Sequence, residues 1–149
     1  MPMRKVATAP DVFIASLPDD VRGTMIELDS IVTSCLPGRV RVLWEGPFWG
    51  GTDQRIIGYG DIVQPRPRSE SVEWFLVGLA RQQRAFSMYV NAVLDGAYLL
   101  ARYADRLGTA KIGSASLSFT RIDDIDRDQL AAMLTQAHEL TPPDGEAHG

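Results

Sequence analysis

The chain has 149 residues, of which 23% are charged, and its formal net charge is −4. This length fits one domain that buries about two thirds of its unfolded surface. The acidic balance argues against a nucleic-acid-binding protein, which usually presents a basic face. No apolar run reaches the ~20 residues of a membrane-spanning helix, and the N-terminus lacks a secretory signal. A lone cysteine, Cys35, excludes an intrachain disulfide, which fits a reducing cytoplasm. Taken together, the charge, the hydropathy and the cysteine count predict a cytoplasmic protein without nucleic-acid or membrane partners.

Helical periodicity dominates the first quarter of the chain. Residues 11–17 form a short amphipathic segment that ends at Pro18. A second helix is expected over 18–38, because proline suits a first helical turn and Pro37–Gly38 stops the helix. Its apolar positions recur at intervals of three and four residues, at Val21, Met25, Leu28, Val32 and Cys35.

Strand-like segments follow, connected by short or polar loops. Alternating or apolar runs occupy residues 39–45, 54–64, 73–80 and 86–93. Short connections between consecutive strands favour antiparallel hairpins. A helix is expected over 95–108 and a short strand over 115–121.

The last helix is expected to begin at Asp126, whose side chain can cap it. Helices at both ends of a run of antiparallel strands predict an α+β fold, a two-layer sandwich with the terminal helices on one face of the sheet. We expect one domain over 1–140. Residues 141–149 are polar and predict a flexible C-terminal tail.

Strand alternation assigns side chains to the two faces of the expected sheet. We predict that Gly58 and Gly60 face the helices, because glycines permit close approach, and that Trp44 also points into the helix layer. The opposite, open face is then a candidate ligand site. Its predicted lining is Glu45, Trp49, Arg55, Tyr59, Asp61, Tyr89 and Asn91. A half-solvated antiparallel sheet presents a similar mixture without any ligand.

The sequence lacks the usual catalytic motifs. Nucleophilic triads need a histidine, and the two in the chain, His138 and His148, lie near the C-terminus. One cysteine and no histidine pair at metal spacing argue against a zinc site. The aspartates between 123 and 128 fit a helix start better than a calcium loop. The sequence therefore favours a non-enzymatic protein.

Several motifs resemble the YdhG-like family of small bacterial proteins. They are LPDDVRGTMIELDSIV, IIGYGDI, GLARQQRAFSMYV and YADRLGTAKIGSASLSFTRIDDID. The resemblance implies a frataxin-like fold and, for some relatives, iron-chaperone activity with weakly bound iron and an iron-using partner protein. Hard carboxylate oxygens suit such iron.

The metal candidates that this resemblance implies are Asp19, Asp20 and Glu27. A solvated helix face carries acids of this kind without any metal. The alternative hypothesis is a small-ligand or protein-binding domain that uses the open sheet face around Tyr59, Asp61 and Tyr89.

Overall fold

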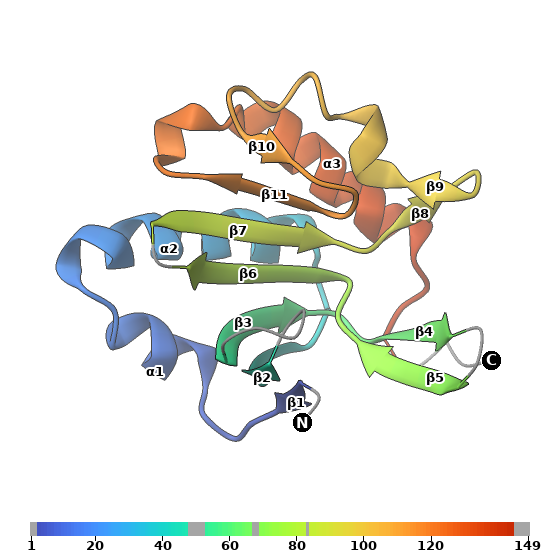
Figure 1. The fold of residues 1–149 in the computed structure, drawn as a ribbon, viewed down its shortest axis with the longest axis horizontal. Coiled ribbons are helices and arrows are strands. Elements are labelled where there is room, and N and C mark those ends of the chain that lie inside the picture. Colours follow the sequence, from blue (N-terminus) through green and yellow to red (C-terminus); the bar gives the residue numbers. More distant parts are fainter. Residues whose placement is uncertain (1–2, 48–52, 67–68, 83, 145–149) are drawn as a thin grey trace.

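The computed structural model describes residues 3–47, 53–66, 69–82 and 84–144 (Figure 1). It has an α+β fold with a large antiparallel sheet, as the sequence predicts. Within the described residues, no helix is long and apolar enough to cross a bilayer.

The α-helices begin and end close to the predicted positions. They are α1 (Pro10–Ala15), α2 (Asp19–Cys35) and α3 (Arg127–Leu140). Helix α2 buries Val21, Met25, Leu28 and Val32 on one face. The Asp126 side chain accepts a hydrogen bond from the backbone N–H of Gln129 at 3.0 Å and so caps α3 as expected.

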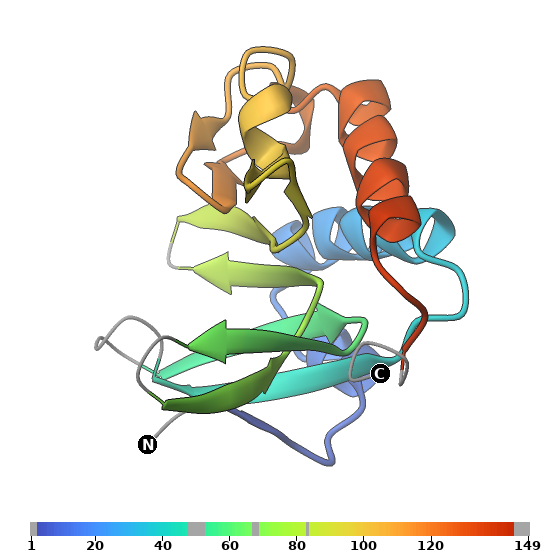
Figure 2. The same ribbon diagram turned by 90° about the vertical axis from the view of Figure 1, so that its right-hand side faces the viewer.

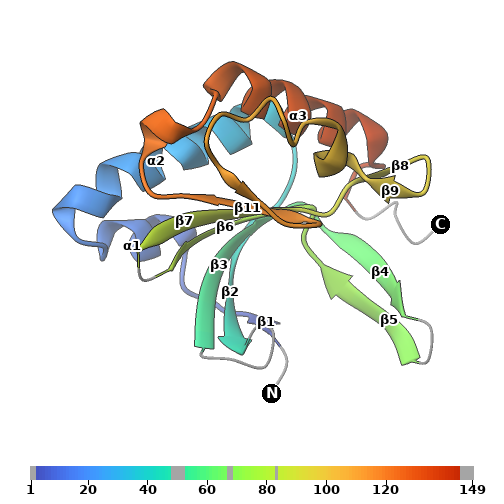
Figure 3. The same cartoon turned by 45° about the horizontal axis from the view of Figure 1, so that its top comes forward.

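The main sheet has the strand order β1-β2-β3-β6-β7-β11-β10 in the described part of the chain, and every neighbouring pair is antiparallel. Its strands are β1 (Arg4–Lys5), β2 (Arg41–Pro47), β3 (Asp53–Tyr59), β6 (Val77–Gln82), β7 (Ala85–Val90), β10 (Lys111–Ile112) and β11 (Ser116–Phe119). Two hairpins stand apart from it. They are β4 (Ile62–Arg66) with β5 (Ser69–Trp74), which projects from the sheet in Figure 3, and β8 (Val93–Leu94) with β9 (Ala97–Tyr98).

Several predicted elements differ from the structure. The expected strand over 73–80 is divided, because β5 of the separate hairpin ends at Trp74 and β6 of the main sheet begins at Val77. The expected strand over 54–64 breaks at Gly60, whose φ of 85° turns the chain out of the main sheet before β4 begins. The expected helix over 95–108 is wrong. Asp95 and Gly96 have φ values of 53° and 81° and form the turn between β8 and β9, and a short 3-10 helix, η1 (Leu99–Arg102), follows. Asp-Gly is a strong hairpin signal, and it outweighed the helical periodicity.

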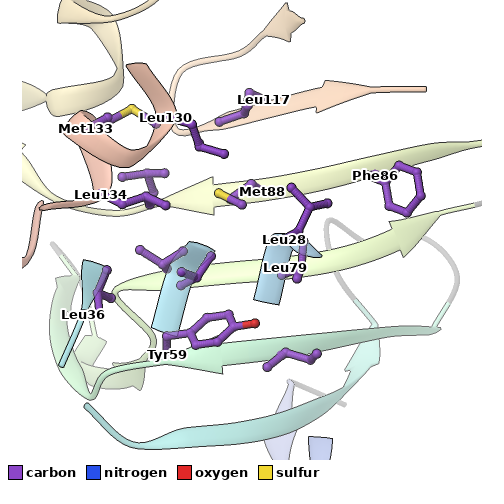
Figure 4. Close-up of a cluster of buried hydrophobic side chains, with 14 of the residues drawn as sticks. Leu28, Leu36, Tyr59, Leu79, Phe86, Met88, Leu117, Leu130, Met133 and Leu134 are labelled. Atoms are coloured by element: carbon purple, nitrogen blue, oxygen red, sulfur yellow. The ribbon is translucent and has the colours of Figure 1, made fainter. Parts of the chain in front are cut away.

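The principal core lies between the sheet and the helices, which share one side of the sheet in Figure 2. Leu79 and Met88 project from β6 and β7 toward Leu28 of α2 and Leu134 of α3 (Figure 4). These four side chains are fully buried. Met88 lies on the core face of β7, which is the face opposite to the one predicted for its neighbour Tyr89.

A second apolar cluster lies on the other side of the sheet. It contains Trp44, Ile56, Phe75, Ala80 and Tyr89, with Met3 and Trp74 packed against it. We call Trp44, Trp74 and Phe75 the aromatic block. The ring centroids of Trp44 lie 5.3 Å from Trp74 and 5.7 Å from Phe75, and Trp74 stacks on Phe75 at 4.4 Å.

The predicted orientation of β2 and β3 is therefore wrong. Trp44 belongs to the second cluster, whereas Leu43 and Ile57 belong to the principal core. Gly58 does permit a close approach to the sheet, but the group that approaches it is the Trp44 ring of the neighbouring strand and not a helix. A Cβ atom on Gly58 would lie 2.6 Å from Nε1 of Trp44, and one on Gly78 would lie 2.5 Å from Cε1 of Phe75.

The first four residues of the predicted tail, 141–144, make hydrogen bonds to the start of β2. The Arg39 side chain, 3% exposed, donates hydrogen bonds to the carbonyls of Thr141 and Pro142 at 2.7 and 2.6 Å. The Asp144 carboxylate accepts from the backbone N–H of Val40 at 2.6 Å. Residues 141–144 are thus fastened to the start of β2.

Substitutions at Trp44 and Gly58 should test the packing of the aromatic block on β3. We expect Trp44→Ala to lower the free energy of unfolding by about 3–5 kcal/mol, as for other large buried aromatics. Gly58→Ala should lower it by about 1–3 kcal/mol because the new methyl group overlaps Trp44. Gly23→Ala is the matched control: nothing lies within 4 Å of its Cβ position on α2, and a gain of ~1 kcal/mol is expected. Urea unfolding measures all three, and a neutral Gly58→Ala would contradict the packing.

Removing the tail should destabilise the protein. A chain that ends at Leu140 loses its hydrogen bonds to a buried guanidinium, and we expect a loss of at least ~1.5 kcal/mol, the lower end for bonds to charged groups. That corresponds to a fall of roughly 3–6 °C in melting temperature for a chain of this size. A chain that ends at Asp144 keeps the described contacts and is the control. Equal melting temperatures for both truncations would show that the tail contacts add no stability.

Candidate functional site

The side of the main sheet opposite the helices is the candidate site, and we call it the helix-free face. In the described residues, the aromatic block occupies this face over β2, β3 and β6. Polar side chains occupy it over β6, β7 and β11. This polar strip consists of Gln82, Ser87, Tyr89, Ser116 and Ser118.

The register of β7 and β11 places the serines of the polar strip together. Ser116 lies opposite Tyr89 and Ser118 lies opposite Ser87. Leu117 lies between the two serines and belongs to the principal core. Because side chains alternate along a strand, Ser116 and Ser118 point to the helix-free face. Both are partly exposed.

A short hydrogen-bond chain organises the buried end of the polar strip. The Ser87 hydroxyl donates to Oε1 of Gln82 at 2.8 Å, and Nε2 of Gln82 donates to the Tyr89 hydroxyl at 3.1 Å. Burial raises the pKa of Tyr89, although Gln82 and Ser87 lower it in part. The Tyr89 phenol therefore stays protonated at neutral pH, and the strip offers uncharged donors and acceptors.

Charged groups lie at the rim of the aromatic block. The Lys5 ammonium is 3.0 Å from Oδ1 of Asp61 and 5.6 Å from the centre of the Trp44 ring. Asn91 donates from Nδ2 to the carbonyl of Phe75 at 2.9 Å. Of the residues predicted to bind a ligand, Asp61 thus forms a rim ion pair, and Asn91 binds the segment between β5 and β6 that carries Phe75 of the block.

Two other predicted residues line a separate, shallow pocket. Glu45 and Arg55 form an ion pair at 3.0 Å at the far end of β2 and β3. The pocket has a volume of about 160 Å³, and its lining is Arg4, Glu45, Gly46, Gln54 and Arg55. Two guanidinium groups and one carboxylate give this lining a net positive charge. Trp49, also predicted for the site, lies outside the described residues.

Tyr59 does not belong to the helix-free face. It is 2% exposed in the principal core, and its hydroxyl donates to Oδ1 of Asp29 on α2 at 2.7 Å. Arg41 binds the same carboxylate through two hydrogen bonds of 2.9 and 2.8 Å and also binds Asp11 at 2.8 Å. Burial and the neighbouring Asp29 charge raise the pKa of Tyr59 well above its ordinary value. Tyr59 therefore couples β3 to α2 as a protonated donor.

The acids proposed as metal ligands are dispersed. Asp19 pairs with Arg22, and Glu27 pairs with Arg127 at 2.6 Å. Asp20 is exposed at the start of α2. In the described part of the chain, no group of three or more histidine, cysteine, aspartate or glutamate side chains could hold a metal ion.

The sequence predicted that Tyr89 and Asn91 lie opposite the core, but it did not predict the rest of the polar strip. The segment ASLSF alternates serine with leucine and phenylalanine, which is a signal that could have placed Ser116 and Ser118 beside Tyr89. The aromatic block had no such signal, because Trp74 and Phe75 are adjacent in sequence and yet pack together on one face.

No protein-family model, curated protein or solved structure matches the chain.

The bond between Tyr59 and Asp29 predicts a measurable loss. We expect Tyr59→Phe to lower the free energy of unfolding by about 1.5–3 kcal/mol, because the lost hydrogen bond joins a buried hydroxyl to a carboxylate. Tyr103→Phe is the control, since its hydroxyl donates to the uncharged Gln136 at a half-buried position. That loss should be only about 0.5–1.5 kcal/mol. Equal effects in denaturant unfolding would show that the bond from Tyr59 to Asp29 adds nothing.

Proposed function

We propose that this chain is a binding domain, not an enzyme, and that its contact surface is the polar strip together with the adjoining edge of the aromatic block. The observation that carries this proposal is the composition of the helix-free face. No described helix covers it, and its polar side chains converge from β6, β7 and β11.

The chemistry of the surface favours a neutral, hydroxyl-bearing small ligand. Small-molecule sites combine apolar and aromatic walls with a few placed polar groups. Here the Trp74 ring of the aromatic block is partly exposed, and the polar strip supplies hydroxyl and amide groups without a charge. Tyrosines with raised pKa values act as hydrogen-bond donors and are poorly suited to act as bases near neutral pH.

The resemblance to YdhG-like proteins supports a second candidate, a frataxin-like two-layer fold with weak iron binding. The exposed carboxylates at the start of α2 support it chemically, because oxygen ligands suit weakly held iron. Iron would have to compete with Arg22 for Asp19 and with Arg127 for Glu27. The helix-free face needs no such rearrangement, and we therefore place it first.

Nuclear magnetic resonance with neutral mono- and disaccharides as probes tests the proposal. We expect a binding sugar to shift the backbone amide signals of Ser87, Tyr89, Ser116 and Ser118. Gln82→Ala should weaken that binding roughly ten-fold, because about 1.4 kcal/mol of hydrogen bonding is lost. Ser34→Ala, at an exposed position on α2, is the control and should leave the affinity unchanged.

Two outcomes would contradict the proposal. The first is that no sugar in the panel shifts these signals at any soluble concentration. The second is that shifts occur at the start of α2 only when ferrous iron is added, and disappear in an Asp19→Asn, Glu27→Gln variant. That second result would establish the iron-binding candidate in its place.

A further inference from the structure

Three hydrogen-bond donors converge on the Asp144 carboxylate. Its Oδ2 accepts from the backbone N–H of Val40 at 2.6 Å. Its Oδ1 accepts from the backbone N–H of Asp61 at 3.0 Å and from Nη1 of Arg39 at 3.2 Å. We call these three donors the carboxylate cradle. Val40 precedes β2 and Asp61 follows β3, so the cradle lies where one strand begins and its neighbour ends.

The cradle is held in place by parts of the chain other than Asp144. The carbonyl of Val40 accepts from the backbone N–H of Gly60 at 2.8 Å, which fixes the two strand ends together. Gly60 has a φ of 85°, and a Cβ atom there would lie 3.4 Å from Cδ of Arg39. This backbone conformation is one that glycine adopts without strain.

Arg39 is also positioned independently of the carboxylate. Its Nε donates to Nδ1 of His138 at 3.1 Å, and its Nη2 donates to the carbonyls of His138 and Thr141 at 3.1 and 2.7 Å. These carbonyls terminate α3, where the helix dipole favours a cation. The guanidinium thus keeps its place when the carboxylate is absent, and a preorganised donor loses little entropy when it binds an anion.

The electrostatics of the cradle match an anion. Burial by itself raises the pKa of Asp144, but the N–H groups of Val40 and Asp61, followed by Arg39, lower the pKa below its ordinary value. Hydrogen bonds to the charged form have this effect on a carboxyl group. Both oxygens are engaged, two donors on one and one on the other, which suits a planar carboxylate.

We infer that the carboxylate cradle is a binding site for carboxylates, and that Asp144 of the chain itself occupies it as an internal ligand. The external ligand class is a small carboxylic acid, which displaces the Asp144 side chain while the Thr141 carbonyl keeps its hydrogen bond to Arg39. This inference does not rest on the proposed function. Asp61 contributes its N–H to the cradle, and its side chain pairs with Lys5 at the rim of the aromatic block.

Chemical rescue of full-length variants tests the inference. Asp144→Ala leaves a space the size of a carboxylate, and we expect sodium formate to raise its melting temperature relative to sodium chloride at equal ionic strength. Formate should also shift the backbone amide signals of Val40 and Asp61. Asp144→Asn is the matched control, because its amide fills the same space, and it should not respond. The unaltered chain should respond only at higher formate concentrations than Asp144→Ala needs, because formate must then displace Asp144. Asp144→Gly with acetate repeats the test, since acetate replaces the whole missing side chain.

Each other outcome overturns part or all of the inference. Absence of shifts at Val40 and Asp61 in both rescued variants would mean that these contacts only fasten the tail. An equal response of the unaltered chain, Asp144→Asn and Asp144→Ala would mean that formate binds elsewhere. If phosphate stabilises Asp144→Ala as strongly as formate, the site is a general anion site, and its assignment to carboxylates is wrong.

Discussion

The close approach of aromatic rings to the glycines of β3 and β6 determines the arrangement of the rest of the fold. Trp44 and Phe75 reach the sheet surface only because Gly58 and Gly78 carry no side chain. The centre of the sheet is therefore buried on both faces, by helices on one side and by the aromatic block on the other. The aromatic block covers one part of the helix-free face, and the polar side chains of that face lie beside it on β6, β7 and β11. The candidate ligand surface results from this separation of aromatic and polar side chains.

The sequence predicted those parts of the fold in which one signal dominates. Helix α2 has a regular apolar stripe, Asp126 caps α3, and β7 alternates Phe86 and Met88 with polar residues. Strand β3 has apolar or glycine positions on both faces, so alternation separates its residues into two sets without saying which set meets the helices. That choice depends on Phe75, which follows a hairpin outside the main sheet.

The same limit applies to the candidate site. Tyr89 was placed correctly because its strand has one apolar face, whereas Tyr59 was misplaced because its partner, Asp29, lies thirty positions away on α2. Local propensity contains no information about such a tertiary contact, which here links a hydroxyl, a carboxylate and Arg41. The contacts of residues 141–144 had no sequence signal for a similar reason, since backbone carbonyls of the tail bind Arg39 and no apolar side chain marks the segment.

Arginine side chains make many of the long-range side-chain hydrogen bonds in the described chain. Arg41 ties β2 to α1 and α2, Arg39 ties the start of β2 to the end of α3, and Arg127 ties α3 to α2. A guanidinium can serve several acceptors at once because its five donors have fixed directions. These contacts use Asp11, Asp29 and Glu27 as structural partners, and Glu27, one of the three predicted metal ligands, is therefore paired with a cation in the fold. The cradle differs from them in one respect, because two of its three donors are backbone amides and do not depend on side-chain identity.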